Sequence, residues 1–280
     1  MKKVFAFCNQ KGGVGKTTSA VNLSTVLATK GYKVLLIDMD AQGNATSGVG
    51  IDKQNLKYTT YQLIVDKLNP YDLTLETEIP GLSLIPSNTD LSGAELELVN
   101  RERREFVLKE QLEPLKAAFD FIFIDCPPSL GITTINCLVA SDYIMIPLQC
   151  EYYALEGLGQ LIHTYQLVQA NLNAELDIGG VILTMADFRT NLTQQVIEEV
   201  RNYFKEKVFE AVVPRSVKMC EAPSFGKPAV LYDPSNKASK CYEAMGGEFV
   251  RRFTALDGGA PAVEEQEQPG PQHSEAETGA

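Results

Sequence analysis

Short apolar runs alternate along the chain with longer amphipathic stretches. The short runs are rich in β-branched and aromatic residues, as in strands that are buried on both faces. They predict six strands, at residues 4–8, 34–37, 82–85, 121–124, 143–147 and 181–183. Helical periodicity predicts five helices, at residues 16–29, 104–118, 155–171, 193–207 and 237–253. The alternation indicates an α/β fold with a mainly parallel, twisted sheet and helices on both faces.

The chain divides into a long patterned part and a short end without pattern. The length suits one large domain with a tail as well as it suits two domains, and we assume one domain over residues 1–256. Within it, residues 44–80 show only weak periodicity. Residues 257–280 are rich in Gly, Pro, Glu and Gln and lack large apolar side chains, which predicts an acidic disordered tail.

The net charge of −11 argues at first against a nucleic-acid partner, because polyanions repel acidic proteins. The charge is unevenly placed, however. Six acidic residues and no Lys or Arg lie beyond Arg252, so much of the excess belongs to the predicted tail. The overall charge therefore does not exclude a basic patch on the domain.

Cysteine usage and hydropathy favour a cytoplasmic protein with reduced thiols. The six cysteines show no CxxC or Cys/His metal spacing, and His163 and His273 lie far apart in sequence. The N-terminus runs into a strand pattern without a signal-peptide core, and no apolar run approaches the roughly 18 to 20 residues that span a bilayer. We expect structural roles for the cysteines and no membrane segment.

A glycine-rich segment stands directly after the first predicted strand and before the first predicted helix. Gly12, Gly13 and Gly15 let backbone N–H groups close around phosphate oxygens without interference from a Cβ atom. Lys16 can reach the terminal phosphates, and the Thr17 hydroxyl can ligate Mg²⁺. The strict GxxxxGK[ST] pattern requires glycine at position 10, where this chain has glutamine. The segment is therefore a variant phosphate loop.

Two more predicted strands end in carboxylates, and the carboxyl ends of parallel strands lie at the same edge of a sheet. Asp125 follows residues 121–124 and suits the shell of a Mg²⁺ ion. Asp40 follows the strand at 34–37 and would share a face with Asp38 if that strand continued, so we expect it to position the attacking water. For Asp38, capping of a turn or helix is as good an explanation as catalysis.

Five segments together resemble the ParA/Soj family of chromosome-partitioning ATPases, whose phosphate loop is a deviant Walker A motif. They are KGGVGKTT at 11–18, DMDAQGN at 38–44, DCPPS at 125–129, QCEYYALEG at 149–157 and EAPS at 221–224. The resemblance covers roughly residues 2–254. It implies a P-loop NTPase-like fold, ATP and Mg²⁺ as cofactors, and a homodimer that closes around ATP.

The resemblance also implies the catalytic residues and the metal ligands. Lys11, which precedes the glycines, would reach the phosphates of the ATP bound to the partner subunit. Lys11, Lys16 and Asp40 are the expected catalytic residues, with Asp40 activating water. Thr17 and, through a water molecule, Asp125 are the expected Mg²⁺ ligands.

The nucleotide contacts that the resemblance implies come from four parts of the chain. Pro214 and Ser216 would contact the adenosine, and Glu151 would reach across the dimer. Relatives often have Asn where this chain has Ser216, and many have Pro where it has Ala41. The expected nucleotide-binding residues are Lys11, Gly12, Gly13, Val14, Gly15, Lys16, Thr17, Thr18, Asp125, Glu151, Pro214 and Ser216.

Basic residues of the C-terminal half are candidates for a DNA-binding surface. Without the resemblance, a solvated basic surface explains them better. With it, Arg189, Arg215 and Lys218 are the expected DNA contacts, and further lysines stand at 227, 237 and 240. Because no base-reading motif is present, we expect contacts to the phosphates of double-stranded DNA that do not depend on sequence. Lys218 stands where relatives often have Arg, and it lacks the bidentate fork of a guanidinium group.

The resemblance further implies a slow ATPase that a ParB-like centromere-binding partner and DNA stimulate, in a cytoplasmic, nucleoid-associated protein. The cargo, chromosome or plasmid, stays open. One alternative is a MinD-like membrane-associated positioning ATPase, but the segment after Arg252 becomes acidic, which anionic lipid repels. A second is an electron-donor iron protein, but the residues around the cysteines of this chain do not match the pattern around the cluster-binding cysteines of that family. A third is a scaffold that binds nucleotide without depending on its hydrolysis.

Overall fold

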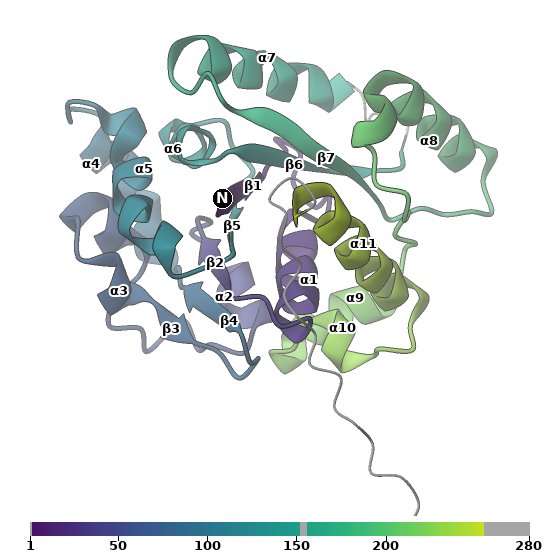
Figure 1. Cartoon of the computed structure of the whole chain (residues 1–280), viewed down its shortest axis with the longest axis horizontal. Helices are drawn as coiled ribbons and strands as arrows, with labels where there is room; N and C mark the ends of the chain where they lie inside the picture. The colour runs from purple at the N-terminus through teal and green to yellow at the C-terminus, as the bar shows by residue number, and fades with distance from the viewer. Residues whose placement is uncertain (1, 152–155, 255–280) are drawn as a thin grey trace, which may run out of the picture.

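A seven-stranded sheet runs through the part of the chain that the computed structural model describes, residues 2–151 and 156–254 (Figure 1). The strand order is β3-β4-β2-β5-β1-β6-β7. Neighbouring strands pair in parallel except β3 and β4, which pair antiparallel. The strands are β1 Lys3–Phe7, β2 Val34–Asp38, β3 Leu75–Glu76, β4 Leu82–Ile85, β5 Phe121–Asp125, β6 Tyr143–Gln149 and β7 Asp177–Thr184. The predicted fold class is confirmed, and the predicted tail at 257–280 lies outside the described residues.

The central strands are buried on both faces, as their continuous apolar runs predict. Side chains of β1 alternate between two separate clusters, with Val4 and Ala6 in one and Phe5 and Phe7 in the other. The strands β2 and β5 alternate in the same way. Because successive side chains of a strand point to opposite faces, each face needs its own helical cover.

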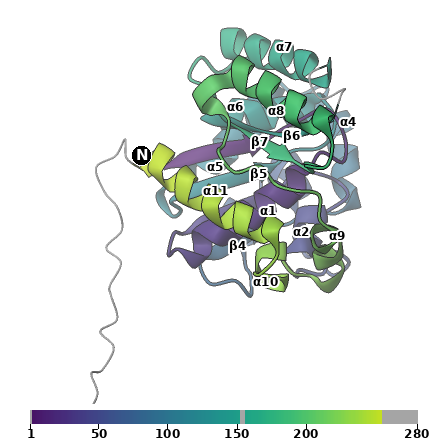
Figure 2. The ribbon, with the colours of Figure 1, turned by 90° about the vertical axis from the view of Figure 1, so that its right-hand side faces the viewer.

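Two groups of helices supply that cover. One cluster packs against α5 Val107–Leu112, α6 Ile132–Ala140, α7 Glu156–Asn171 and α8 Asn191–Phe204. The other packs against α1 Lys16–Thr29, α10 Ala229–Tyr232 and α11 Lys237–Thr254. Figures 1 and 2 show α11 lying beside α1, and a Cβ atom on Gly246 would meet Val26 of α1 at 2.4 Å. Four short helices complete the set: α2 Asn44–Gly48, α3 Pro70–Leu73, α4 Ala94–Leu98 and α9 Val217–Glu221.

Several predicted helix boundaries were wrong, for identifiable reasons. The predicted helix at 104–118 is three shorter pieces, a 3₁₀ turn at Arg104–Phe106, α5, and a second 3₁₀ turn at Glu113–Ala117 that contains Pro114. Proline lacks the N–H that an α-helix needs at this point. The helix α8 begins two residues earlier than predicted because the Thr190 side chain caps it through the N–H of Thr193. Its predicted end at 207 was also wrong, since α8 ends at Phe204.

Other elements gave no periodic signal at all. The helix α6 was missed because seven of its nine residues are buried, so polar residues mark no exposed face. The first residues of β7 were missed because they include Gly179 and Gly180, over which Tyr143 and Phe209 pack closely. The two-residue strand β3 lies in the weakly patterned region at 44–80. These elements depend on tertiary packing rather than on local pattern.

Candidate phosphate-binding site

The glycine-rich loop between β1 and α1 adopts a conformation that depends on its glycines. Gly13 and Gly15 have φ values of 72° and 88°, in the left-handed region that other residues rarely adopt. Gly15 immediately precedes α1, so the loop ends at a helix N-terminus with its partial positive charge. Gly12 is exposed, and no atom lies within 4 Å of the place that its Cβ would take. The loop can therefore surround a phosphate group and still present Gly12 to solvent.

Two side chains that the sequence did not single out hold this loop in place. The Asn9 amide donates to the Pro147 carbonyl of β6 at 2.8 Å, and its oxygen accepts from the Lys11 N–H at 3.0 Å. The Thr184 hydroxyl at the end of β7 donates to the Val14 carbonyl at 2.8 Å. Both residues are buried. The sequence signal that could have found them is a polar residue at the end of an apolar run.

Lys16 is buried at the start of α1, with 7% of its surface exposed. Its ammonium group donates to the Lys11 carbonyl at 3.4 Å, across the mouth of the loop. A cation held here by its own loop can exchange that long hydrogen bond for a phosphate oxygen. The Thr17 side chain follows it and is half-buried.

Asp125 ends β5 opposite Phe7 of β1 and Asp38 of β2. Its carboxylate is completely buried, and neither oxygen has a hydrogen-bond partner among the described residues. Burial and the neighbouring Asp38 carboxylate raise the pKa of Asp125 well above its usual range. The nearby Thr17 hydroxyl, which does not meet the geometry of a hydrogen bond to this carboxylate, and Lys16 oppose that rise. A buried carboxylate without a partner is costly in a folded protein unless a cation meets it. The donor set of Asp125 and the Thr17 hydroxyl, both hard oxygens, fits Mg²⁺.

Asp38, by contrast, is fully hydrogen-bonded within the chain. One oxygen accepts from the Thr46 N–H at 2.8 Å and from the Thr46 hydroxyl at 2.7 Å, and the other accepts from the Asp40 N–H at 3.2 Å. The same hydroxyl accepts from the Ser87 N–H beyond β4. Burial raises the pKa of Asp38 to about 6, although the hydrogen bonds from Thr46 lower it. Of the two explanations for Asp38, the structure favours the structural one, since it orients α2.

Asp40 lies in the bend after β2, which ends at Asp38. The strand does not continue, so strand alternation does not set the direction of the Asp40 side chain. One carboxylate oxygen of this half-buried residue accepts from the Gln42 N–H at 2.9 Å. Gly43 then turns the chain into α2 with a φ of 61°, and a Cβ there would come within 2.7 Å of the Ser87 carbonyl oxygen. This turn fixes Asp40 at the same sheet edge as the phosphate loop.

Glu151 joins two of the other candidate residues. Its carboxylate lies 3.8 Å from the Lys11 ammonium group and 3.1 Å from the Arg215 guanidinium group. All three side chains are between 40% and 62% exposed, so water screens these pairs. Lys11 and Glu151, both expected to act across a dimer, thus contact each other within the chain.

The two residues expected to contact adenosine lie beyond the end of β7. Pro214 forms an isolated parallel β-bridge with Ala186, in which the Arg215 N–H donates to the Ala186 carbonyl at 3.0 Å. Ser216 is half-buried, and its hydroxyl lies 3.2 Å from the Asn236 side-chain oxygen. These contacts bring both residues to the sheet edge that carries the phosphate loop.

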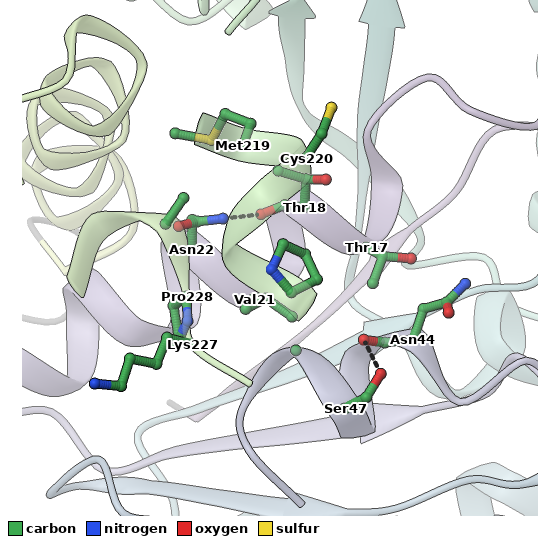
Figure 3. A pocket seen from close by; sticks show the side chains of 13 residues that line it. Thr17, Thr18, Val21, Asn22, Asn44, Ser47, Met219, Cys220, Lys227 and Pro228 are labelled. Carbon is green, nitrogen blue, oxygen red and sulfur yellow. Dashed lines mark hydrogen bonds between the residues drawn. The ribbon is translucent and has the colours of Figure 1, made fainter. Parts of the chain in front are cut away.

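A cavity of about 270 Å³ opens beside the start of α1 (Figure 3). Thr17 and Thr18 line it from α1, Asn44 and Ser47 from α2, and Cys220 from α9. Pro214 and Ser216 are not among its lining residues. The cavity therefore lies beside the phosphate loop but does not extend to the residues expected to contact adenosine.

The three candidate DNA-binding residues are all at the surface, and each has a carboxylate beside it. Arg189 follows β7 and pairs with Asp187 at 2.6 Å. Lys218 is the second residue of α9 and pairs with Glu221 at 2.9 Å, and Arg215 pairs with Glu151 as described above.

All six cysteines are free, and four of them are buried, while Cys220 is exposed and Cys241 is partly buried. Within the described ranges, no group of three or more His, Cys, Asp or Glu side chains could hold a metal ion. No helix in the described part of the chain is long and apolar enough to cross a membrane.

Comparisons with known proteins found a matching family model and similar chains. A family model named AAA domain matches residues 2–178. The chain is 52% identical over 252 residues to the chromosome partitioning protein ParA of Myxococcus xanthus, which covers 90% of this chain and 89% of that protein. It is 54% identical over 250 residues to the sporulation initiation inhibitor protein Soj of Bacillus subtilis, covering 89% and 99%.

A solved structure extends the comparison to bound ligands. The crystal structure of cobyrinic acid a,c-diamide synthase from Mycobacterium smegmatis, with a bound ATP analogue and magnesium, matches with a TM-score of 0.81. It is 33% identical in sequence, and the match covers 91% of this chain and 97% of that one. A protein of the same fold thus binds an adenine nucleotide together with magnesium.

Proposed function

The chain belongs to the ParA/Soj family of chromosome-partitioning ATPases, and we propose that it works as an ATP-dependent dimer that binds DNA without sequence preference. In this proposal, ATP closes the dimer, the dimer binds the phosphates of double-stranded DNA, and hydrolysis releases both. The protein acts in the cytoplasm on the nucleoid, with a slow basal ATPase. The names of its relatives favour partitioning over the MinD-like and iron-protein alternatives.

One observation carries the nucleotide part of the proposal, the buried Asp125 carboxylate without a hydrogen-bond partner among the described residues. It lies where β5 ends, beside the phosphate loop, and burial raises its pKa. We assign Asp125 and Thr17 to Mg²⁺, with Asp125 acting through water. Mg²⁺, when bound, supplies positive charge to the phosphates. Lys16 and the backbone N–H groups of the loop would hold the phosphate oxygens. The left-handed glycines leave these N–H groups accessible.

Hydrolysis is assigned to Asp40. Its backbone is held by the turn that Gly43 closes, so the carboxylate is fixed at the edge of the site. Among the residues that the structure describes, the hydrogen bond from the Gln42 N–H is the only one to this carboxylate. Asp40 can therefore accept a hydrogen bond from water and orient it toward the terminal phosphate, while Lys16 stabilises the charge that develops there.

Dimer closure is assigned to Lys11, Gly12 and Glu151. Lys11 is 40% exposed, and its pair with Glu151 is screened, so it can leave that carboxylate for a phosphate of the partner's nucleotide at small cost. The open space at Gly12 supports a close approach of the two loops. Two subunits then present Arg189, Arg215 and Lys218 together, which doubles the number of phosphate contacts. A ParB-like centromere-binding protein is the partner that would accelerate hydrolysis.

A Gly12→Val variant tests this arrangement. Because the position has open space and no positive φ, valine should leave the monomer folded and able to bind ATP but should keep two loops apart. Light scattering with ATP should then show dimers of the wild-type protein and monomers of the variant.

The control is Gly247→Val, which adds the same side chain on α11, where the new Cβ would meet only the Arg251 guanidinium, at 3.7 Å, outside the backbone of its own helix. This variant should still dimerise. ATP-dependent dimers of Gly12→Val at the wild-type level would contradict the proposed closure.

A further inference from the structure

Each cation assigned to DNA binding carries a carboxylate of the same chain. Arg189 is paired with Asp187, Arg215 with Glu151, and Lys218 with Glu221, at nitrogen-to-oxygen distances of 2.6, 3.1 and 2.9 Å. These carboxylates therefore offset much of the positive charge of the proposed surface in the free chain, although Glu151 is shared with Lys11.

We propose that these carboxylates, Asp187 above all, are internal counter-ions that compete with DNA phosphates for the basic residues and so hold DNA affinity low. This inference rests on the proposed DNA-binding function. A phosphate gains affinity from a cation by Coulomb attraction and by the release of condensed counter-ions. A cation that already holds a carboxylate must give it up first, and the displaced carboxylate then lies next to the polyanion. Both effects weaken binding.

The pair of Asp187 and Arg189 is the most complete of the three. The guanidinium Nε and Nη2 donate to the two carboxylate oxygens at 2.8 and 2.6 Å, and the Arg189 backbone N–H donates to the first oxygen at 3.2 Å. The Thr190 hydroxyl, which caps α8, also donates to the Asp187 carbonyl at 3.1 Å. The fork of Arg189 that would suit a phosphate is thus occupied by a carboxylate two residues away.

Asp187 remains charged at any pH at which the protein would work. The hydrogen bonds from Arg189 lower the pKa of Asp187 to about 2. Its competition with DNA is therefore constant in pH. The side chain of Arg189 is 88% exposed, so the pair is weak enough for DNA to displace it.

The opposite role is also physically reasonable, because a carboxylate can orient a guanidinium group whose remaining N–H groups face the ligand. The two roles predict opposite signs when Asp187 loses its charge. A counter-ion that competes with DNA should give tighter binding when it is neutralised, whereas an orienting carboxylate should give weaker binding.

The experiment compares Asp187→Asn and Glu221→Gln with the wild-type protein. Glu151 is left intact, because it also holds Lys11 of the proposed nucleotide site. Binding of a fluorescent DNA duplex of arbitrary sequence is measured by anisotropy across a salt titration, with a non-hydrolysable ATP analogue. Exposed ion pairs of this kind change equilibria by about 1.5- to 5-fold each, so a dimer with two copies should bind about 2- to 30-fold more tightly.

The matched control is Asp177→Asn. Asp177 is an exposed aspartate paired with Lys207 at 2.6 Å, but it stands at the opposite end of β7. Its neutralisation changes the net charge of the protein equally and should change DNA affinity much less. Equal tightening in Asp177→Asn and Asp187→Asn would overturn the inference, since net charge alone would explain it.

Failure of the inference and failure of the proposed function are distinguishable. If Arg189→Ala weakens DNA binding but Asp187→Asn binds as the wild type does or more weakly, only the internal counter-ions are overturned. If the wild-type protein with the ATP analogue binds no DNA, or Arg189→Ala binds undiminished, the assigned DNA surface itself is wrong, and the inference is overturned with it.

Discussion

Replacing Asp125 by asparagine should stabilise the nucleotide-free protein at neutral pH and remove its response to magnesium. Asp125 is a buried carboxylate whose oxygens lack hydrogen-bond partners among the described residues, and Asp38 stands opposite it on the neighbouring strand. Asparagine has nearly the same shape and no charge. We expect a gain of about 1–3 kcal/mol in the free energy of unfolding at pH 7, the usual cost of a buried polar group without a partner.

The gain should depend on pH with a defined sign. Because the pKa of Asp125 is raised in the folded state, the folded protein binds more protons than the unfolded chain once the pH passes the usual carboxyl range. The stability of the wild-type protein therefore falls as pH rises from about 4, by at most about 1.4 kcal/mol per pH unit for this group. The Asp125→Asn variant lacks this contribution, so its advantage should be small near pH 5 and largest near pH 7.5.

Thermal unfolding in a chelator, without nucleotide, measures this difference. A gain of about 1–3 kcal/mol corresponds to a rise of about 2–12 °C in melting temperature for a chain of this size. ADP with magnesium should raise the melting temperature of the wild-type protein further but not that of Asp125→Asn. The reasoning is refuted if the variant melts at or below the wild-type temperature at pH 7.5, or by the same margin at both pH values.

Asp38→Asn is the matched control, because Asp38 is equally buried at the end of the adjacent strand. It accepts three hydrogen bonds, so an amide group would turn an N–H against one of the donors from Thr46 or Asp40. Burial also raises the pKa of Asp38, so removal of its charge offsets part of this loss, and we expect Asp38→Asn to be less stable than Asp125→Asn at pH 7.5.

Three further predictions follow from the proposed site. The Asp40→Ala variant should still bind ATP and dimerise, but its rate of phosphate release should collapse, which traps the DNA-bound state. Turnover at the wild-type rate in a phosphate-release assay would contradict the assignment of Asp40. Arg189→Ala should lower the salt slope of DNA binding by nearly two for the dimer, about 0.9 for each lost phosphate contact, at an unchanged melting temperature; an unchanged slope in the same titration would contradict it. Binding of ADP with magnesium should release protons and tighten as pH rises from about 5 to 7.5, because burial raises the pKa of Asp125. Calorimetry in two buffers of different ionisation enthalpy measures the number of protons released, and proton uptake on binding would contradict the prediction.

Local signals were sufficient for the elements closest to the site. The helix α1 begins and ends where the pattern predicts, since Gly15 precedes it and Gly31 turns the chain away after it. The strands β1, β2 and β5 were found within one residue at each end, because strands buried on both faces have continuous apolar runs. The order of these strands then brings Asp38, Asp125 and the loop to one edge.

What the sequence could not supply depends on contacts between distant residues. Asp38 and Asp125 end their strands in the same way, yet only the hydrogen bonds from Thr46 and Asp40 show that one is structural and the other available. The pair of Glu151 and Arg215 joins residues 64 positions apart. Hydrophobic periodicity predicts neither the hydrogen bonds to Asp38 nor the pair of Glu151 and Arg215, because the loops beyond the sheet set both.

The most direct test of the account is DNA binding under four nucleotide conditions, namely ATP, a non-hydrolysable ATP analogue, ADP and no nucleotide, with one duplex and its sequence-scrambled counterpart. The account predicts that both duplexes are bound equally with the analogue, transiently with ATP, and hardly at all with ADP or without nucleotide. Binding of equal strength in all four conditions, or absence of binding with the analogue, would contradict the claim that ATP assembles the DNA-binding surface.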